Sequence, residues 1–294
     1  MKKKEISAAY LHQHESIFQC PICSQAMTII DLKSLVCSQG HTFDIAKQGY
    51  LNLLTHPLNT HYDKELFDSR RIIAESGFFD PLNEVINELI QNHIRPTNRE
   101  TLKLLDTGCG EGSNLAHIVQ RSKTQFPVDV LGTGIDIAKE GIMAAAKTYA
   151  NMIWCVADLA RSPFQEHTFD CILNILSPAN YGEFNRLLTE NGLIIKVFPQ
   201  NQYLKELREV FYEEEEKQLY SNEKTLARFR DSFQIIDQAS LHYDFPLSDS
   251  LIPHLIRMTP LSWSTSENRI ETLLKSNLSQ ITVAFDILVG KGIK

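Results

Sequence analysis

Apolar runs alternate with amphipathic stretches through the middle of the chain. Short uninterrupted runs predict buried strands, and helical spacing of the apolar residues between them predicts covering helices. The first predicted strand ends near residue 106, and the others span residues 128–135, 151–156, 168–174 and 193–198. The predicted helices span residues 113–121, 138–149 and 184–188, with a turn at Asn191 and Gly192. This alternation predicts an α/β fold around a mostly parallel sheet.

The two ends of the chain carry shorter patterns. Near the N-terminus, the predicted elements are strands at 27–31 and 33–36, a loop at 55–63, and helices at 64–74 and from Pro81 to about residue 93. Pro81 suits a first helical turn because its φ is already helical and its missing N–H would have no partner there. Towards the C-terminus, the predicted elements are strands at 233–245 and 281–289 and helices at 250–258 and 266–278. The acidic run at 213–216 predicts a solvated helical surface.

Composition limits the class of protein. The chain has 294 residues, of which 43% are hydrophobic, and this suffices for one sizeable core and a small second module. The net charge of −7 argues against broad binding to nucleic-acid phosphates, although it leaves room for a local basic face. No apolar stretch approaches the roughly 18 residues of a membrane span, and the N-terminal lysines lack the apolar segment of a signal peptide. The six cysteines therefore predict reduced thiols in a cytoplasmic protein.

The stretch from Asp106 to Gly112 ends the first central strand with the sequence D-T-G-C-G-E-G. Its glycines, Gly108, Gly110 and Gly112, predict a tight turn, since glycine reaches positive φ and lets a ligand approach the backbone closely. The first N–H groups of the following helix would face that ligand. A dinucleotide fingerprint needs a glycine where this chain has Ser113, so the turn favours a nucleoside cofactor without a pyrophosphate. S-adenosylmethionine (SAM) fits this description best.

Two acidic residues follow the next two strands. Asp136 ends the strand at 128–135, where a carboxylate can accept hydrogen bonds from both hydroxyls of a ribose. Asp158 follows the strand at 151–156, where it can accept from the 6-amino group of adenine. Either residue alone could instead cap the helix after it. Because both stand at the expected strand ends, we favour a SAM site made of the turn and these two carboxylates.

Four metal-ligating residues precede the α/β region. Cys20 and Cys23 form a C-x-x-C pair, and Cys37 and His41 form a C-x3-H pair. Two such pairs on tight turns complete a tetrahedral zinc site, and with no open ligand position the zinc would be structural. The alternative is a redox-active C-x-x-C with an unrelated cysteine and histidine nearby. We predict a zinc-binding domain at residues 1–54, a linker with two helices at 55–98 and a methyltransferase domain at 99–294.

The substrate is expected at the same edge of the sheet, because ligands of open α/β sheets gather at the carboxyl ends of the strands. Asn174 ends the strand at 168–174 and Ser177 follows it, so both are candidates for substrate contact. Arg70 and Arg71 either belong to a solvated face or meet a phosphate or the SAM carboxylate. Aromatic residues that could stack on a substrate ring, or simply pack in the core, are Tyr50, Tyr181 and Trp263. The sequence identifies no catalytic base.

With these residues the chain resembles the RlmA family, the 23S ribosomal RNA guanine-N1 methyltransferases. The resemblance spans nearly the whole chain. It includes the four zinc ligands, the segments at 43–54 and 77–82, the Arg70-Arg71 pair, the glycine turn, and Met258-Thr259-Pro260 with Trp263. The glycine turn is shared by very many methyltransferases, whereas a zinc module fused to it with these linker residues is much more specific.

The resemblance implies a Rossmann-like class I SAM-dependent methyltransferase with a small N-terminal zinc ribbon, forming a homodimer with a cleft for RNA. The implied substrate is a guanine in the hairpin 35 loop of 23S rRNA, at nucleotide 745 or 748, near the binding site of macrolide antibiotics. The resemblance also implies cofactor contacts at Phe79, Asn114, Leu115 and Tyr203. Many relatives carry tyrosine where this chain has Phe79, so only a packing contact is expected there.

Two other functions are compatible with the sequence. One is SAM-dependent methylation of a small molecule, which SAM binding without affinity for RNA would indicate. The other is a non-catalytic zinc-ribbon protein that binds RNA, which failure to bind SAM would indicate. The glycine spacing, Asp136 and Asp158 count against the second function.

Overall fold

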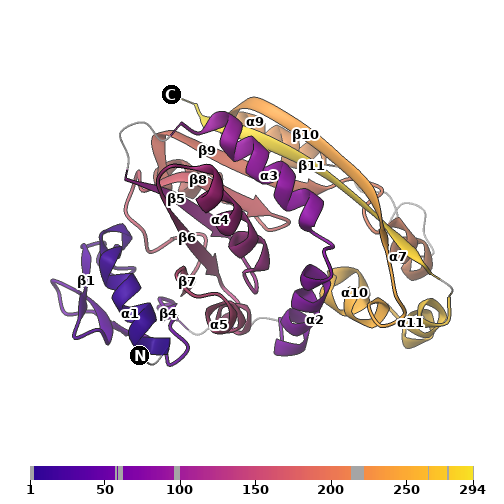
Figure 1. Cartoon of the computed structure of the whole chain (residues 1–294), viewed down its shortest axis with the longest axis horizontal. Coiled ribbons are helices and arrows are strands. Elements are labelled where there is room, and N and C mark those ends of the chain that lie inside the picture. The colour runs from indigo at the N-terminus through magenta and orange to yellow at the C-terminus, as the bar shows by residue number, and fades with distance from the viewer. Residues whose placement is uncertain are drawn as a thin grey trace.

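The computed structural model describes residues 3–56, 58, 62–95, 100–212, 222–263, 265–276 and 278–293. These residues form a central eight-stranded sheet with helices on both faces, and a small three-stranded sheet near the N-terminus (Figure 1). The strands of the central sheet follow the order β10-β11-β9-β8-β5-β6-β7-β4. Strands β9 to β4 of this order are parallel, and β11 and β10 extend the sheet in antiparallel fashion. The α/β prediction is confirmed.

Apart from β4, which was not predicted, the strands of the central sheet agree with the predicted ones except at their ends. Their bounds are β4 (Leu51–Asn52), β5 (Thr101–Thr107), β6 (Asp129–Asp136), β7 (Ile153–Val156), β8 (Phe169–Ile175), β9 (Leu188–Pro199), β10 (Phe233–Pro246) and β11 (Gln280–Gly292). The small sheet contains β1 (Met27–Ile30), β2 (Ser34–Cys37) and β3 (Thr42–Asp44), all antiparallel.

The helices fall into an N-terminal, a central and a C-terminal set. The first includes α1 (Lys3–Gln13), the short 3-10 helix η1 (Glu15–Ile17), α2 (Lys64–Glu75) and α3 (Asp80–His93). The second includes α4 (Ser113–Gln125), α5 (Lys139–Thr148), α6 (Tyr181–Leu187) and α7 (Lys205–Phe211). The third includes α9 (Glu223–Ser232), α10 (Ile252–Met258), η2 (Pro260–Ser262) and α11 (Glu267–Leu274). Part of the predicted loop at 55–63 and the acidic run at 213–216 lie outside the described residues.

Each face of the central sheet has its own apolar core. On one face, α3 and α4 pack through side chains such as Ile86, Ile90 and Ile118. On the other face, α6 and α9 pack through Phe184 and Phe229, in the same cluster as residues of the small module. The predicted helical and strand spacings therefore correspond to faces that are buried against the sheet.

One local prediction is wrong. Asn191 and Gly192 do not form a turn before a strand, because β9 already begins at Leu188 and runs through both residues. The register of β9 against β8 shifts here, since Phe169 is opposite Leu188 while Cys171 is opposite Leu193. The Asn-Gly pair is accommodated as an irregularity inside a long strand, where tertiary pairing overrides the local turn preference.

The N-terminal segment contributes directly to the central sheet. Strand β4, which lies within the residues predicted for the zinc-binding domain, pairs in parallel with β7, with Leu51 opposite Cys155. The backbone N–H of Leu53 also donates to the carbonyl oxygen of Val156. The small module is thus joined to the edge of the larger sheet by backbone hydrogen bonds.

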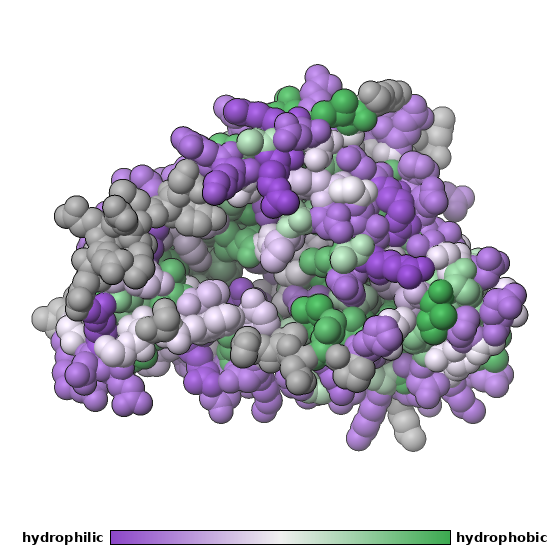
Figure 2. Space-filling model, turned by 180° about the vertical axis from the view of Figure 1, so that it is seen from behind, coloured by the Kyte–Doolittle hydropathy of each residue, from purple (hydrophilic) through white to green (hydrophobic). Residues whose placement is uncertain are grey.

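The side of the molecule that faces away from the viewer in Figure 1 is mostly hydrophilic. It has a hollow near its middle where apolar side chains reach the surface (Figure 2). Within the described residues, none of the helices combines the length and the apolar character needed to span a membrane.

Candidate active site

The four predicted metal ligands converge on one point. Their ligand atoms all lie within 4.8 Å of one another. The Nδ1 atom of His41 lies 3.4 Å from Sγ of Cys37 and 3.5 Å from Sγ of Cys20, and the sulfurs of Cys23 and Cys37 are 3.6 Å apart. A tetrahedral zinc ion with Zn–S bonds of about 2.3 Å places its ligand atoms about 3.7 Å apart, so this donor set fits zinc.

The glycine turn connects β5 to α4 in the predicted conformation. Gly108, Gly110 and Gly112 have φ of 78°, 57° and 84°, which other residues rarely adopt. A Cβ on Gly108 would lie 2.6 Å from Cβ of Ser177, and one on Gly112 would lie 2.5 Å from the ring of Trp154. The glycines therefore allow the turn to approach its neighbours closely, as well as a cofactor.

Two buried carboxyl groups stand at the turn. Asp106 is 2% exposed, and its Oδ1 has no hydrogen-bond partner among the described residues. Burial, followed by the nearby charges of Asp136 and Glu111, raises the pKa of Asp106 to about 8. Glu111 accepts hydrogen bonds from the backbone N–H and the hydroxyl of Ser113, and burial raises its pKa despite these bonds. An unpartnered, buried Asp106 oxygen beside the turn is consistent with a polar cofactor at this place.

Asp136 holds the glycine turn and the segment that leads from β6 into α5. Its Oδ2 accepts from the N–H of Gly110 and its Oδ1 from the N–H of Ala138, both at 2.8 Å. Burial raises the pKa of Asp136, and these two hydrogen bonds oppose the increase. Each oxygen keeps a second lone pair, so the carboxylate remains able to accept from a ribose. The helix-cap alternative is wrong for Asp136, because the residue at the N-cap of α5 is Ala138 and no side chain caps this helix. The two hydrogen bonds of Asp136 are compatible with the cofactor role.

Asp158 lies at the neighbouring strand end. The N–H of Ala157 donates to the carbonyl oxygen of Asp136, which brings the ends of β6 and β7 together. The Asp158 side chain is exposed and its Oδ1 accepts from the N–H of Ala160 at 2.8 Å. The turn, Asp136 and Asp158 thus lie along one edge of the sheet, as the parallel topology requires.

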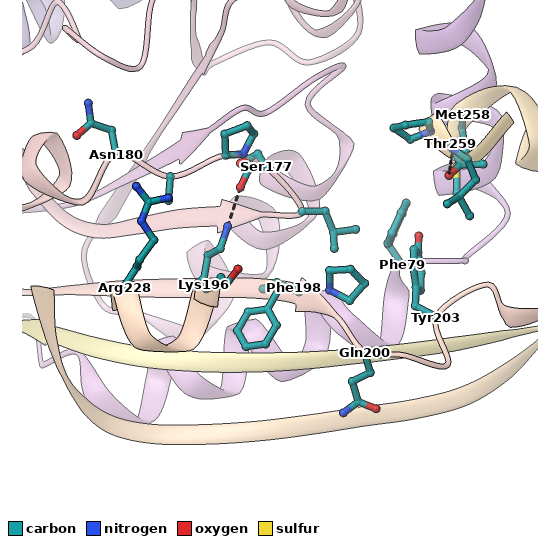
Figure 3. A pocket seen from close by; sticks show the side chains of 18 of the residues that line it. Phe79, Ser177, Asn180, Lys196, Phe198, Gln200, Tyr203, Arg228, Met258 and Thr259 are labelled. Carbon is teal, nitrogen blue, oxygen red and sulfur yellow. Dashed lines mark hydrogen bonds between the residues drawn. The ribbon is translucent and has the colours of Figure 1, made fainter. Parts of the chain in front are cut away.

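A cleft of about 1270 Å³ opens beside this edge. Its lining includes Phe79, Ser177 and Tyr203, which the sequence assigned to cofactor or substrate. In Figure 3, Ser177, Asn180, Lys196 and Arg228 gather at one end of the cleft, while Phe79, Tyr203, Met258 and Thr259 lie at the other. Among the lining residues that the structure describes, the cationic ones are Arg70, Lys196, Arg208 and Arg228, and the acidic one is Asp231.

Arg70 and Arg71 have different surroundings, which separates two residues that the sequence could not distinguish. Arg70 lines the cleft, and a Cβ on Gly110 would come within 3.2 Å of its guanidinium. Arg71 instead donates to Glu75 one turn later at 2.9 Å, as on an ordinary helix surface. Arg70 is therefore the one of the pair that can serve a ligand.

Asn174 is fully buried, so its side chain does not face the cleft. Its Nδ2 lies within hydrogen-bond distance of Oγ of Ser177 at 2.6 Å, the carbonyl oxygen of Pro178 at 2.9 Å and the hydroxyl of Thr107 at 3.0 Å. Its Oδ1 accepts from Nζ of Lys196. Asn174 thus fixes the segment that carries Ser177, and of the two substrate-side candidates only Ser177 lines the cleft.

Lys196 is a residue that sequence reasoning missed. It lies in β9, 5% exposed, and its Nζ donates to Oδ1 of Asn174 and to the carbonyl oxygen of Ser177 at 2.6 Å. Burial lowers the pKa of Lys196 to about 8. The available signal was a single lysine inside the apolar run L-I-I-K-V-F at 193–198, since a lysine is almost never buried without a partner.

Of the remaining candidates, all but Tyr181 lie apart from the main cleft. Asn114 accepts from Nδ2 of Asn83 at 3.3 Å and lines a second groove of about 670 Å³, which Phe79 also borders. Leu115 is fully buried in the core, so only its backbone can face a cofactor. Tyr50 is also core, whereas Trp263 is 50% exposed and lines a separate groove. Tyr181 is the stacking candidate that lines the cleft.

Comparisons with known proteins agree with both parts of the chain. The zinc-ribbon family described as "RlmA, N-terminal" matches residues 18–60, and the family described as "Methyltransferase domain" matches residues 104–192. YxjB of Bacillus subtilis (strain 168), provisionally assigned as a 23S rRNA (guanine-N(1)-)-methyltransferase, is 43% identical over 277 residues, covering 94% of this chain and 97% of YxjB. The 23S rRNA (guanine(748)-N(1))-methyltransferase of Streptomyces fradiae is 26% identical over 247 residues, covering 83% and 85% of the two chains.

The fold, the glycine turn and the cysteine–histidine cluster define a class I SAM-dependent methyltransferase with an N-terminal zinc ribbon. The extent of the match to YxjB assigns it further: the chain belongs to the 23S rRNA (guanine-N1-)-methyltransferase family.

Proposed function

We propose that this protein methylates N1 of a guanine in 23S rRNA, with SAM as the methyl donor and zinc as a structural ion. The observation that carries the proposal is the cleft beside the glycine turn. Of the described residues, four cationic side chains and one carboxylate line it, although the whole chain has a net charge of −7. A local excess of positive charge next to a SAM turn suits a polyanionic substrate better than a small neutral one.

The residues of the chain divide the work between cofactor and substrate. The glycine turn, Asp106, Asp136 and Asp158 would hold SAM, which supplies an electrophilic methyl group when bound. Ser177, held by Asn174 against Gly108, forms the boundary between the turn and the cleft. Arg70 and Arg228 would bind phosphates, while Tyr181 offers an aromatic surface to an unstacked base. Positioning of this kind accounts for much of the acceleration in a methyl transfer.

The finer assignment is a guanine of the hairpin 35 loop, at nucleotide 745 or 748. It is supported by the similarity to the Streptomyces fradiae enzyme, whose name specifies position 748. An rRNA substrate implies action in the cytoplasm, and methylation beside the macrolide site implies an effect on susceptibility to these antibiotics. We also propose that the protein acts as a homodimer, and that the functional division is 1–54 for zinc, 55–98 as linker and 99–294 for catalysis.

The experiment is transfer of labelled methyl groups from SAM to 23S rRNA fragments that contain hairpin 35. Reverse transcription should then stop at one guanine, because N1 methylation blocks base pairing. Transcripts with either guanine replaced serve as matched substrates, and Gly110→Arg serves as the inactive enzyme, since an arginine there would fill the turn beside Arg70. Absence of transfer by protein with bound zinc and measurable SAM affinity would contradict the proposal.

A further inference from the structure

Methylation at N1 of guanine raises a question that the sequence leaves unanswered. The N1 atom carries a proton, and its electron pair is a poor nucleophile until the proton leaves. A group in the cleft must accept this proton, and it must lie where the base edge meets the methyl donor. The inference below rests on the proposed function and assigns this group.

The position of Lys196 follows from contacts that lead from the glycine turn to the cleft. Gly108 of the turn approaches Ser177 so closely that a Cβ on the glycine would lie 2.6 Å from that of the serine. The carbonyl oxygen of Ser177 accepts from Nζ of Lys196 at 2.6 Å (Figure 3). Lys196 itself lines the cleft. One residue, Ser177, therefore separates Nζ of Lys196 from the glycine turn, and Nζ lies on the substrate side of Ser177.

We propose that Lys196 is the general base that removes the N1 proton of the target guanine. The two acceptors that hold it, Oδ1 of Asn174 and the carbonyl oxygen of Ser177, come from β8 and the segment after it. A neutral amine has two N–H donors and one lone pair. Among the described residues these acceptors match the two donors, so the lone pair takes the remaining tetrahedral position of Nζ. Asn174 is thus a positioning residue that orients the base.

The chemical step balances without any further reactant. The lone pair of Nζ forms a bond to the N1 proton, and the electron pair of the N–H bond stays on N1. That pair then forms the bond to the methyl carbon while the carbon–sulfur bond of SAM breaks, with its electrons remaining on sulfur. The ammonium of Lys196 subsequently releases its proton to water, so the products are N1-methylguanine, S-adenosylhomocysteine and one proton.

The electrostatic environment favours an amine that titrates near neutrality. Burial lowers the pKa of Lys196 to about 8, so a useful fraction is neutral at physiological pH. The charged or titratable groups of α6 and α9 that line the cleft with Lys196 are Tyr181, Arg228 and Asp231. On β11, Asp286 is opposite Phe198, two residues along β9 from Lys196. Asp286 accepts from Gln200 and Ser240 at 2.6 and 2.8 Å. The residue of β11 that pairs with Lys196 is the apolar Leu288.

The first test compares substitutions of Lys196 in the methyl-transfer assay under single-turnover conditions. Lys196→Met should lower the rate by about 100-fold or more, in the range expected for loss of a general base. Lys196→Arg should lose as much, because arginine keeps the charge but does not deprotonate. Lys205→Met, the same change at an exposed lysine outside the cleft, should leave the rate unchanged. An active Lys196→Arg enzyme would show that only the positive charge is needed and would overturn the assignment.

The second test is the dependence on pH. The wild-type rate should rise tenfold per pH unit below about 8 and level off above it, as the amine becomes fully neutral. Lys196→Met should lose this plateau. Small primary amines should restore part of its activity, more strongly the more basic the amine. The assignment of Lys196 as the base would be refuted if Lys196→Met kept the pH dependence of the wild type. It would also be refuted if this variant reacted at nearly the wild-type rate and added amines had no effect.

A third measurement does not depend on turnover. With ¹³C-labelled lysine, the wild-type protein should show one side-chain resonance that titrates near pH 8 and is missing from Lys196→Met. SAM affinity and thermal stability of the variants, measured by calorimetry, separate loss of the base from misfolding. If wild-type protein does not methylate rRNA, the proposed function fails. If it does and the variants behave like wild type, only the assignment of Lys196 fails.

Discussion

Three buried polar side chains lie at the edge of the sheet that carries the proposed site: Asp106, Asn174 and Lys196, each 5% exposed or less. The sequence could place Asp106 in the turn and Asn174 at a strand end, because strand ends and glycine spacing are local patterns. It could not show that Asn174 faces away from the cleft or that Lys196 contacts it, because the two residues meet only when β8 and β9 pair. Burial and partners are tertiary properties, so the roles of these residues required the structure.

At Asp106 the structure predicts an opposition between stability and function. The pKa of this carboxyl is raised from 3.8 to about 8, so its protonated form is favoured in the folded protein. The contribution of protonated Asp106 to the free energy of unfolding is fully present below pH 4 and is lost as the pH rises towards 8. Asp106→Asn should therefore unfold at a higher temperature than wild type at pH 8, by about 2–4 °C for each kcal/mol recovered.

The same substitution should weaken SAM binding, since the amide NH2 group replaces one of the two carboxyl oxygens with a group that cannot accept a hydrogen bond. Calorimetric unfolding between pH 4 and pH 9, together with SAM titrations, measures both effects, and Asp249→Asn at an exposed position is the control. A stability difference that does not increase with pH would contradict the origin assigned to it.

Among the elements that the sequence predicted, the turn between β5 and α4 agrees best with its prediction and β9 agrees least. A glycine turn can be predicted from residues that are adjacent in the sequence, and the φ angles of its glycines agree with the prediction. Strand β9 begins at Leu188 and passes through an Asn-Gly pair that locally favours a turn. The pairing of both flanks with β8 decides the outcome there, and no local pattern reports that pairing.

Gly108 allows a prediction about the turn as an element. Gly108→Ala should lower SAM affinity at least about tenfold, because its φ of 78° is strained for alanine and the new Cβ would clash with Ser177. Displacement of Ser177 should also reduce transfer at saturating SAM. Gly182→Ala in α6 is the matched control, because its Cβ would only touch Asn180 at 3.7 Å. Equal SAM affinities for the two variants, measured by titration calorimetry, would refute this account.

For the whole molecule, the zinc ribbon and the methyltransferase fold share one core. Leu35 and Ile45 of the small module belong to the same buried cluster as Leu105 and Ile153 of the central sheet. Backbone pairing of β4 with β7 adds to this contact. The sequence predicted both modules and their boundary near residue 54, but the shared core and the pairing are long-range contacts that composition does not reveal.

Removal of zinc should consequently affect the whole molecule. Chelation should lower the unfolding temperature of the single calorimetric transition, because the ribbon that packs against the sheet loses its organising ion. Addition of zinc should restore the transition, and addition of magnesium should not, since thiolate ligands prefer the softer ion. Two separate transitions, with only the smaller one sensitive to the chelator, would contradict this prediction.

Strand β4 also constrains the order of events during synthesis. Residues 51–52 leave the ribosome about a hundred residues before residues 155–156, with which they pair. The zinc-binding residues are complete by His41, so the ribbon can acquire its metal while the nascent chain still lacks its glycine turn and both acidic strand ends. Strand β4 then pairs with β7 late, when the N-terminal unit is already folded. Scarce zinc during translation would therefore reduce the yield of active enzyme, even if zinc became abundant afterwards.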